Sequence, residues 1–318
     1  MPAERPEFPR LDHRRARTVP LQARPSKVAR EALAGPPAPG STFREFFGRL
    51  PRILAAEELR AAVRAIRQAR GSGRPVIWGL GAHVIKVGLN PVIIGLMDAG
   101  YVSGLAMNGA GAIHDFELAL VGQTSEDVAE GLATGTFGMA EETGRYLNEC
   151  AAEAMAAGAG WGEMVGRKIL ELNLPNADIS LLAQAYRRGI PATLHVTVGA
   201  DIIHMHPAAR GDALGAASFE DFLRFAGLVA RLEGGVYLNV GSAVVLPEVF
   251  LKALNLARNL GHRVENFTTV NLDMMRHYRP SENVLRRPTL QGGRGIHLTG
   301  HHELMVPLLA QALVEGLG

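Results

Sequence analysis

Two hydrophobic patterns alternate along most of the chain. In residues 56–70, Leu59, Ala62, Val63 and Ile66 recur at helical spacing. From residue 75 onward, short runs rich in β-branched and aromatic residues alternate with longer helical segments. This order is typical of parallel βαβ units. The sequence therefore predicts an α/β fold that is preceded by N-terminal helices.

The boundaries of the expected elements follow from these patterns and from glycine and proline positions. We expect strands at 75–80, 101–107, 192–198, 202–206, 235–240 and 264–270. We expect helices at 43–49, 56–70, 83–98, from about 114, and at 178–188, 218–233, 246–260 and 301–316. The glycine- and proline-rich run 35–40 separates a basic, solvated arm (1–40) from one domain (41–318).

Composition narrows the class of protein. The 318 residues are 47% hydrophobic, which suits a large α/β domain, and the formal net charge of +2 gives no nucleic-acid signature. The single cysteine, Cys150, excludes an internal disulfide and fits a reducing compartment. No apolar run approaches the ~18 residues that span a bilayer. We therefore expect a cytoplasmic protein that binds neither nucleic acid nor membrane.

Two glycine-rich turns, 79–83 and 108–112, each follow a predicted strand and open a predicted helix. Glycine lets the backbone approach a phosphate closely, and the start of a helix offers free N–H groups. Neither turn completes a GxGxxG motif, because Val84 and His114 stand at the third-glycine positions. A phosphate-binding turn and an ordinary strand–helix turn therefore remain alternatives on these residues alone.

The histidines suggest a different chemistry. Asp201, His204 and His206 are spaced as possible metal ligands, and 297–302 holds a second group of histidines. On a strand, His204 and His206 would point to the same face. A metal-dependent amidohydrolase is thus an alternative, but carboxylate ligands at complementary spacing are not evident. The preferred interpretation contains no metal.

Longer motifs resemble the bacterial-type branch of the deoxyhypusine synthase family. They occur in the right order between about residues 45 and 316, at 81–93, 106–117, 124–128, 137–144, 278–284 and 298–303. The resemblance implies a doubly wound, mainly parallel, Rossmann-like α/β subunit with helices on both faces. It also implies an NAD-bound homotetramer with active sites between paired subunits.

The reaction that the resemblance implies is an NAD-dependent transfer. NAD takes a hydride from the carbon beside a secondary amine of a polyamine such as spermidine, and an aminobutyl group passes to an acceptor amine. The cofactor carries most of this chemistry, and the protein positions the polyamine.

By position, the resemblance assigns cofactor contacts to both glycine turns and to a later strand end. These residues are Gly81, His83, Gly109, Ala110, Gly111, Asp115, Thr268 and Thr269. Asp115 has a carboxylate that can accept hydrogen bonds from a ribose hydroxyl. His114 departs from the family's paired acids, and we expect it beside the substrate.

The resemblance also implies acidic residues that hold the cationic substrate. Asp201 and Glu282 fall near acidic family positions, and Asp273 aligns with a family aspartate. A desolvated ammonium group needs a carboxylate partner. We expect Glu282, Asp273 and Lys86 to take part in catalysis. A turn cap at Asp201 and a helix-start charge at Glu282 are the structural alternatives.

The family's catalytic lysine has no counterpart here. Residues 280–288 supply Arg286 and Arg287, and no lysine follows Lys252. An arginine, with a pKa above about 12, cannot provide a neutral nitrogen lone pair. We therefore expect a small amine to attack the substrate imine directly, unless Lys86 or Lys168 replaces the missing lysine. A non-catalytic homologue that binds NAD or polyamine is the alternative.

Overall fold

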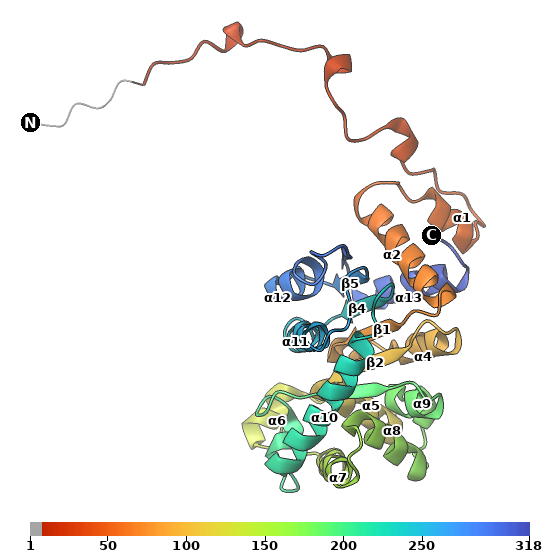
Figure 1. The fold of residues 1–318 in the computed structure, drawn as a ribbon, viewed down its shortest axis with the longest axis vertical. Helices are drawn as coiled ribbons and strands as arrows, with labels where there is room; N and C mark the ends of the chain where they lie inside the picture. The colour runs from red at the N-terminus through yellow and green to blue at the C-terminus, as the bar shows by residue number, and fades with distance from the viewer. Residues whose placement is uncertain (1–7) are drawn as a thin grey trace, which may run out of the picture.

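The computed structural model describes residues 8–318, and its centre is one six-stranded, all-parallel sheet with the order β3-β2-β1-β4-β5-β6 (Figure 1). The strands are β1 (Val76–Leu80), β2 (Gly104–Asn108), β3 (Ala192–His195), β4 (Val236–Val240), β5 (Thr268–Asp273) and β6 (Arg294–Thr299). Every neighbouring pair is parallel. The predicted α/β class is confirmed.

Helices connect the strands and cover both faces of the sheet. They are α1 (Phe43–Arg49), α2 (Leu54–Gly71), α3 (Ala82–Lys86), α4 (Asn90–Asp98), α5 (Gly109–Val121), α6 (Val128–Thr134), α7 (Glu141–Ala157), α8 (Trp161–Glu171), α9 (Leu181–Arg187), α10 (Gly211–Val229), α11 (Val245–Asn259), α12 (Tyr278–Pro280) and α13 (His302–Val314). A π-helix (Ser281–Arg286) continues directly from α12.

Alternation along the central strand shows why the sheet needs two helical layers. Val76, Trp78 and Leu80 of β1 belong to a core cluster that includes apolar residues of α2, α4 and α13. Ile77 belongs to a second cluster, which includes Phe225 of α10 and apolar residues of α11. Both faces of β1 are therefore buried, as expected for a strand in the middle of a parallel sheet. The predicted doubly wound arrangement is confirmed.

Two of the predicted elements differ from the structure. The expected strand 202–206 is a 3-10 helix, Ile202–Met205, because Gly199 turns the chain at φ +87 after β3 and Ile203 packs inward. The expected helix 83–98 is divided into α3 and α4 by Gly88, which has φ +78. Strand β6 was not predicted, since its run 294–299 begins with an arginine and a glycine.

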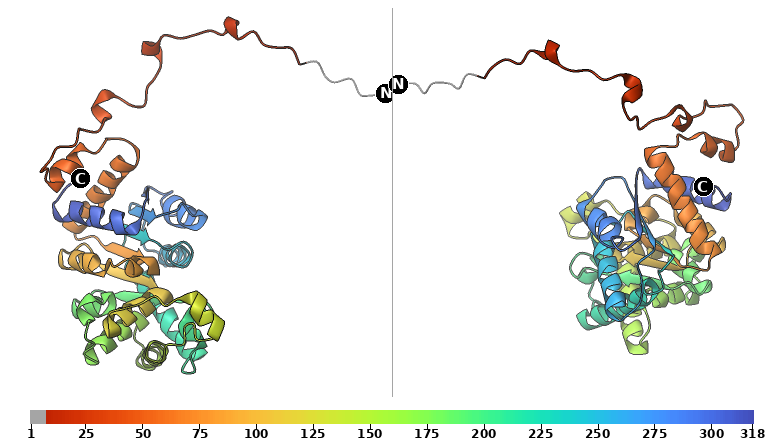
Figure 2. Two further views of the ribbon diagram at one scale, coloured as in Figure 1. Left: turned by 180° about the vertical axis from the view of Figure 1, so that it is seen from behind. Right: turned by 45° about the horizontal axis from the view of Figure 1, so that its top comes forward.

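The N-terminal segment leads away from the domain in all three views (Figures 1 and 2). Residues 8–31 are exposed, and residues 1–7 of the expected arm lie outside the described part of the chain. Backbone contact with the domain begins at Ala32, whose carbonyl accepts from the Arg52 N–H at 2.9 Å. The other end of the chain lies beside α1 and α2 (Figure 1). Within residues 8–318, no helix combines the length and the hydropathy that a membrane crossing requires.

Candidate active site

The strand order reverses between β1 and β4, and this point defines the candidate site. From here the chain adds β2 and β3 on one side and β5 and β6 on the other. In such sheets, ligands bind in the crevice outside the carboxyl ends of the strands. Gly81 follows β1, and its N–H donates to the Val240 carbonyl at 2.8 Å. A Cβ atom at Gly81 would collide with the Gly241 carbonyl, so glycine is required where the two turns meet.

The second glycine turn is covered by a carboxylate of the protein itself. Asn108 caps α5 by accepting from the Gly111 N–H at 3.0 Å. The Asp201 carboxylate lies against Gly109, where any Cβ atom would overlap it. Its Oδ2 atom is buried and has no hydrogen-bond partner within residues 8–318. Burial raises the pKa of Asp201, although His204 and the nearby Thr197 and Ala110 amides lower it.

A cavity of about 200 Å³ opens beside this carboxylate. Four residues predicted from the sequence line it, namely Lys86, Ala110, His114 and Asp201. Ile113 and Phe137 supply apolar wall, and Glu117 and Glu126 add acidic groups. The structure thus brings together one basic residue, one histidine and three acids around one open cavity.

The hydrogen bonds of His114 fix its tautomer. Its Nδ1 lies 2.6 Å from the Thr124 hydroxyl, which itself donates to Glu117 Oε2 at 2.5 Å. Because the single Thr124 proton goes to the carboxylate, His114 Nδ1 must be the donor, and Nε2 is left as an acceptor. Burial, and then the charge of Lys86, lower the pKa of His114 to about 4. The ring is therefore neutral at pH 7.

His204 is a site residue that the sequence interpretation considered only as a metal ligand. Its Nδ1 accepts from the Gly199 N–H at 3.1 Å, so a neutral ring carries its proton on Nε2. That Nε2 atom is buried and has no partner within the described residues. One turn of chain therefore presents an unpaired donor at His204 and an unpaired acceptor at Asp201.

Asp115 lies inside the protein and not on the wall of the cavity beside Asp201. Its side chain is fully buried, and four groups donate to its two oxygens: Asn90 Nδ2 at 3.0 Å, Ser180 Oγ at 2.6 Å, Leu181 N at 2.7 Å and Leu182 N at 3.0 Å. Burial outweighs these bonds and raises its pKa to about 6. The carboxylate joins α5 to α4 and to the start of α9, and protein groups donate to both of its oxygens. The ribose contact that the resemblance implied for it stays a prediction.

Thr268 and Thr269 also lie away from the crevice. In the sheet register, Thr268 is level with Val236 and therefore with Val76, the first residue of β1. The two threonines thus begin β5, at the amino edge of the sheet, whereas the predicted strand 264–270 placed them at its end. The cofactor contact implied for them is incompatible with a site at the carboxyl edge.

Asp273 is the last residue of β5, at the carboxyl edge of the sheet and on the other side of the strand reversal from Asp201. Its Oδ1 accepts from the Met274 N–H at 2.8 Å. The charge of Asp273 also acts on the buried His302, although burial is the larger effect and lowers the pKa of that ring. His302 meets the predicted cofactor residue His83 edge to face, with ring centroids 5.6 Å apart. Asp273, His83 and His302 therefore gather over β1, β4 and β5.

A chain of polar side chains that was not predicted runs across β4, β5 and β6. Asn239 Nδ2 donates to Asn271 Oδ1 at 2.7 Å, and Asn271 Nδ2 pairs with His297 Nδ1 at 3.1 Å. The three residues are level in the sheet register. A buried asparagine inside an otherwise apolar strand was the available sequence signal, because buried polar groups need partners.

Glu282 lies in the π-helix and not on the wall of the cavity beside Asp201. Arg286 Nη2 contacts its carboxylate at 2.5 Å and Arg287 Nε at 3.5 Å. The hydrogen bond from Arg286 is the main reason that the pKa of Glu282 is lowered. The charge of Glu282 is thus already balanced by the two arginines that stand in the region of the missing lysine.

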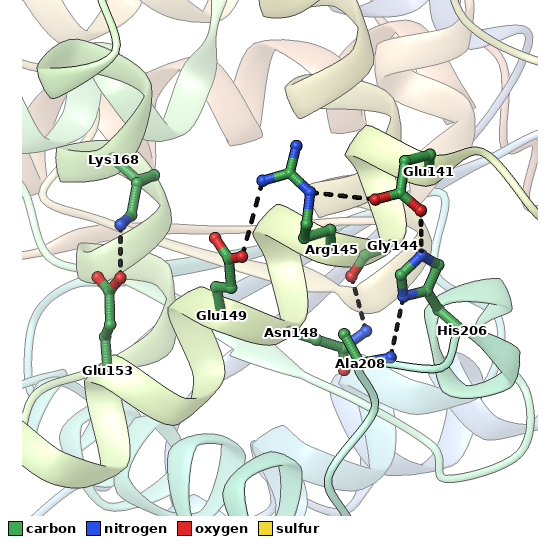
Figure 3. A network of polar contacts seen from close by, with 9 residues as sticks. All are labelled: Glu141, Gly144, Arg145, Asn148, Glu149, Glu153, Lys168, His206 and Ala208. Carbon is green, nitrogen blue, oxygen red and sulfur yellow. Dashed lines mark hydrogen bonds and ion pairs between the residues drawn. The ribbon is translucent and has the colours of Figure 1, made fainter.

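Lys168 and His206 are held in a separate polar network (Figure 3). Lys168 on α8 pairs with Glu153 on α7 at 2.5 Å, and this hydrogen bond raises its pKa. His206 donates from Nε2 to Glu141 at 3.2 Å and accepts from the Ala208 N–H at Nδ1. Both ring nitrogens are occupied, and residues 8–318 contain no group of three or more metal-ligating side chains.

Comparisons with known proteins identify the fold but not a family. No family model and no curated protein matches the chain. A LOR/SDH protein from Methanococcus maripaludis S2 is 15% identical, with a TM-score of 0.52, over 83% of this chain and 70% of its own. AgrE, solved with ornithine and NAD+, is 17% identical, with a TM-score of 0.51, over 84% of this chain.

A deoxyhypusine synthase assigned in Entamoeba histolytica also shares the fold. It is 11% identical, with a TM-score of 0.50, over 87% of this chain and 94% of its own length. The chain spans about a third of AgrE, 34%. At these identities the comparisons establish the deoxyhypusine synthase-like, Rossmann-type fold.

Proposed function

We propose that this protein binds NAD across the carboxyl edge of its sheet and transfers an alkyl group, such as aminobutyl, from a polyamine to an acceptor amine. The buried, unpartnered Asp201 oxygen over the start of α5, on the β2–β3 side of the strand reversal, carries the proposal. Two proteins of this fold support it by their descriptions: AgrE was solved with ornithine and NAD+, and another is assigned as a deoxyhypusine synthase.

The residues of the crevice suit the two halves of a dinucleotide, which lie on opposite sides of a strand reversal. We assign the adenosine half to the cavity of Ile113, Phe137 and Asp201, where the free Oδ2 can accept from a ribose hydroxyl. The Asp201 carboxylate already covers the start of α5, so we assign the pyrophosphate to the Gly81–Gly241 contact instead of the Gly109 turn.

The amine then belongs beside Asp273, on the nicotinamide side of the reversal. Bound NAD would take a hydride from the carbon beside the amine nitrogen and return it later. The nitrogen loses its proton in the same oxidation, and an imine results. The acceptor amine adds to the imine carbon, the original amine leaves, and the returned hydride produces the new secondary amine. Asp273 supplies the carboxylate that balances the ammonium charge during these steps.

The arrangement of the lysines supports direct attack by the acceptor amine. The sequence contains four lysines, and Lys86 alone lines the cavity beside Asp201. Lys168 and Lys252 are paired with Glu153 and Glu248 on the surface. Lys252 reaches the region of Glu282, because Glu248 also accepts from Asn283, but its amine is engaged by that ion pair and is not poised as a nucleophile.

A non-catalytic homologue is the second candidate. It is favoured by the two arginines that neutralise Glu282, because this carboxylate is then not free to bind an ammonium group. Such a protein would bind NAD or polyamine as a sensor or as the partner of an active subunit. Assembly as a homotetramer stays a prediction for either candidate, and light scattering checks it.

Calorimetry with NAD+ and NADH tests the first step of the proposal. We expect Asp201→Asn to weaken NAD binding about tenfold through the lost charge-assisted hydrogen bond, and Asp273→Asn to leave it within about twofold. Spermidine, homospermidine and agmatine, each with NAD, should then give reduced cofactor or new amines in the wild type. Binding without turnover would select the non-catalytic candidate. No binding of either dinucleotide would reject the transferase, and no binding of polyamine as well would reject both candidates.

A further inference from the structure

We infer that a second ligand site, for a small polyphosphate, lies at the amino edge of the sheet. A cavity of about 320 Å³ opens there between the end of α2, the start of β1 and the end of α10. Arg70, Arg74 and Arg231 line it, and no acidic residue does. Pro75 and Ser103 form its floor just before β1 and β2, so it lies at the opposite edge of the sheet from Asp201 and Asp273.

The three arginines differ from most others on the domain surface. Arg64, Arg188 and Arg294, for example, pair with acids at 2.7, 2.8 and 3.0 Å. Within residues 8–318, the guanidinium groups of Arg70, Arg74 and Arg231 make no ion pair and no hydrogen bond. Three like charges that share one concavity repel one another unless an anion joins them.

The cavity stays cationic after the nearby helix ends are counted. The carboxyl ends of α2, α4 and α10 lie around it, and each helix end carries about −0.5 of a charge. The three positive charges of the arginines, reduced by the roughly 1.5 negative charges of the helix ends, leave a net charge of about +1.5. This residual charge is located in a space large enough for two or three linked phosphate groups.

Part of the site is held in place before any ligand arrives. The guanidinium of Arg70 stacks over Tyr101 at 4.9 Å from the ring centroid. Tyr101 is buried, and its hydroxyl donates to the Leu313 carbonyl at 3.0 Å. Gly100, at φ +72, lets the chain pass close to Arg70, where a Cβ atom would come within 3.2 Å of Nε. A fixed guanidinium loses less entropy when it forms its paired bonds to an oxyanion.

A polyphosphate fits this arrangement better than a single phosphate. Arg70 and Arg74 come from one segment at the end of α2 and Arg231 from another at the end of α10, so a ligand with several linked anionic groups can engage all three. Arginine forks match phosphate and carboxylate oxygens alike. Tripolyphosphate, orthophosphate and citrate therefore serve as probes that distinguish linked phosphates, one phosphate and a tricarboxylate.

Calorimetry at low salt tests the site, with circular dichroism to check folding. We expect tripolyphosphate to bind more tightly than citrate or orthophosphate, and Arg74→Gln and Arg231→Gln each to weaken it about tenfold. Arg187→Gln is the matched control, since Arg187 is exposed in the last turn of α9 and lies outside the cavity. It should change affinity less than twofold.

Three results would overturn the inference: no binding of tripolyphosphate, an equal loss in the Arg187→Gln control, or competition by saturating NAD. Competition would place the anion at the carboxyl edge. Because tripolyphosphate binding at this edge does not depend on NAD, its failure leaves the proposed dinucleotide site untouched. Likewise, if Asp201→Asn does not change NAD binding, the proposed polyphosphate site is unaffected.

Discussion

The Asp201 carboxylate rests on Gly109, and position 109 has no room for a Cβ atom beneath it. Gly109→Ala should therefore push Asp201 out of the cavity while α5 stays folded. We expect NAD affinity to fall about as far as in Asp201→Asn, with an overpacking cost of about 1–3 kcal/mol in unfolding free energy. Calorimetry and urea unfolding measure the two effects.

Gly215→Ala is the control for this substitution. Gly215 also lies in a helix, but nothing is within 4 Å of the added Cβ. Alanine should raise the unfolding free energy by up to about 1 kcal/mol and leave NAD affinity unchanged. Unaltered NAD affinity in Gly109→Ala would mean that Asp201 is not part of the dinucleotide site.

Asp115 should behave as a structural residue, not as a cofactor ligand. Asp115→Asn replaces a carboxylate that accepts four hydrogen bonds with an amide, whose NH2 group cannot accept a hydrogen bond from the donors that face it. We expect a loss of about 2–4 kcal/mol in unfolding free energy. NAD affinity of the folded fraction should stay within about twofold. The exposed Asp178→Asn, close in sequence to the Asp115 partner Ser180, should cost less than about 0.5 kcal/mol. A stable Asp115→Asn variant that fails to bind NAD would restore the ribose role.

The hydrophobic periodicity predicted the α/β fold because this pattern depends on residues that are close together in the sequence. Residues 75–80 read as a buried strand, and β1 is buried on both faces as the second helical layer requires. The register could not be predicted in the same way. Thr268 and Thr269 were placed at a strand end, but only pairing with β4 shows which end of β5 they occupy.

The sequence placed Gly81 and Gly109 at the carboxyl edge because each follows a predicted strand directly, and the resemblance added Asp273, the last residue of β5. For Asp115, the sequence does not show which way the side chain points. One position beyond His114, it points into the protein, and its partners Ser180 and Leu181 are about 65 residues away in sequence. The arginine cavity was not predictable for the same reason, since Arg231 meets Arg70 and Arg74 only in the fold.

His114 should titrate far below its ordinary pKa of 6.5. Burial and then Lys86 lower this pKa to about 4. NMR of the ring protons should therefore show a neutral His114, with its proton on Nδ1, from pH 8 down to about 5. Lys86→Gln removes the smaller cause and should raise the pKa of His114, while burial keeps it below 6.5. A midpoint near 6.5 in the wild type would contradict the buried geometry.

Asp221 gives the protein an unusual dependence of stability on pH. Its carboxylate accepts from the Leu194 and Gly162 N–H groups at 2.8 and 2.9 Å, while Oδ1 has no partner within residues 8–318. Burial is the larger effect and raises the pKa of Asp221 from 3.8 to about 7. The folded state thus binds this proton more tightly than the unfolded state does.

The contribution of Asp221 is therefore complete below about pH 4 and is lost as the pH rises through about 7. The difference in unfolding free energy between wild type and Asp221→Asn should fall by at most about 1.4 kcal/mol per pH unit in that window. Urea unfolding at pH 5, 6, 7 and 8 measures it. Asp212→Asn, on the same helix, should give a constant difference over this range, because Arg210 lowers the pKa of Asp212. A difference that grows with pH would show that the charged form is stabilised.

Lys86 provides the sharpest test of direct transfer. Borohydride reduces an imine to a stable amine, so any covalent bond between a lysine and the substrate is trapped as an added mass. With spermidine and NAD present, we expect no adduct on Lys86, because no hydrogen bond or ion pair holds its amine toward Asp273 within residues 8–318, and none on Lys168, whose amine pairs with Glu153. Mass spectrometry of peptides locates any adduct, and Lys168→Arg controls for surface reaction. An adduct on Lys86 that disappears in Asp273→Asn would instead establish an enzyme-bound imine at the carboxyl edge.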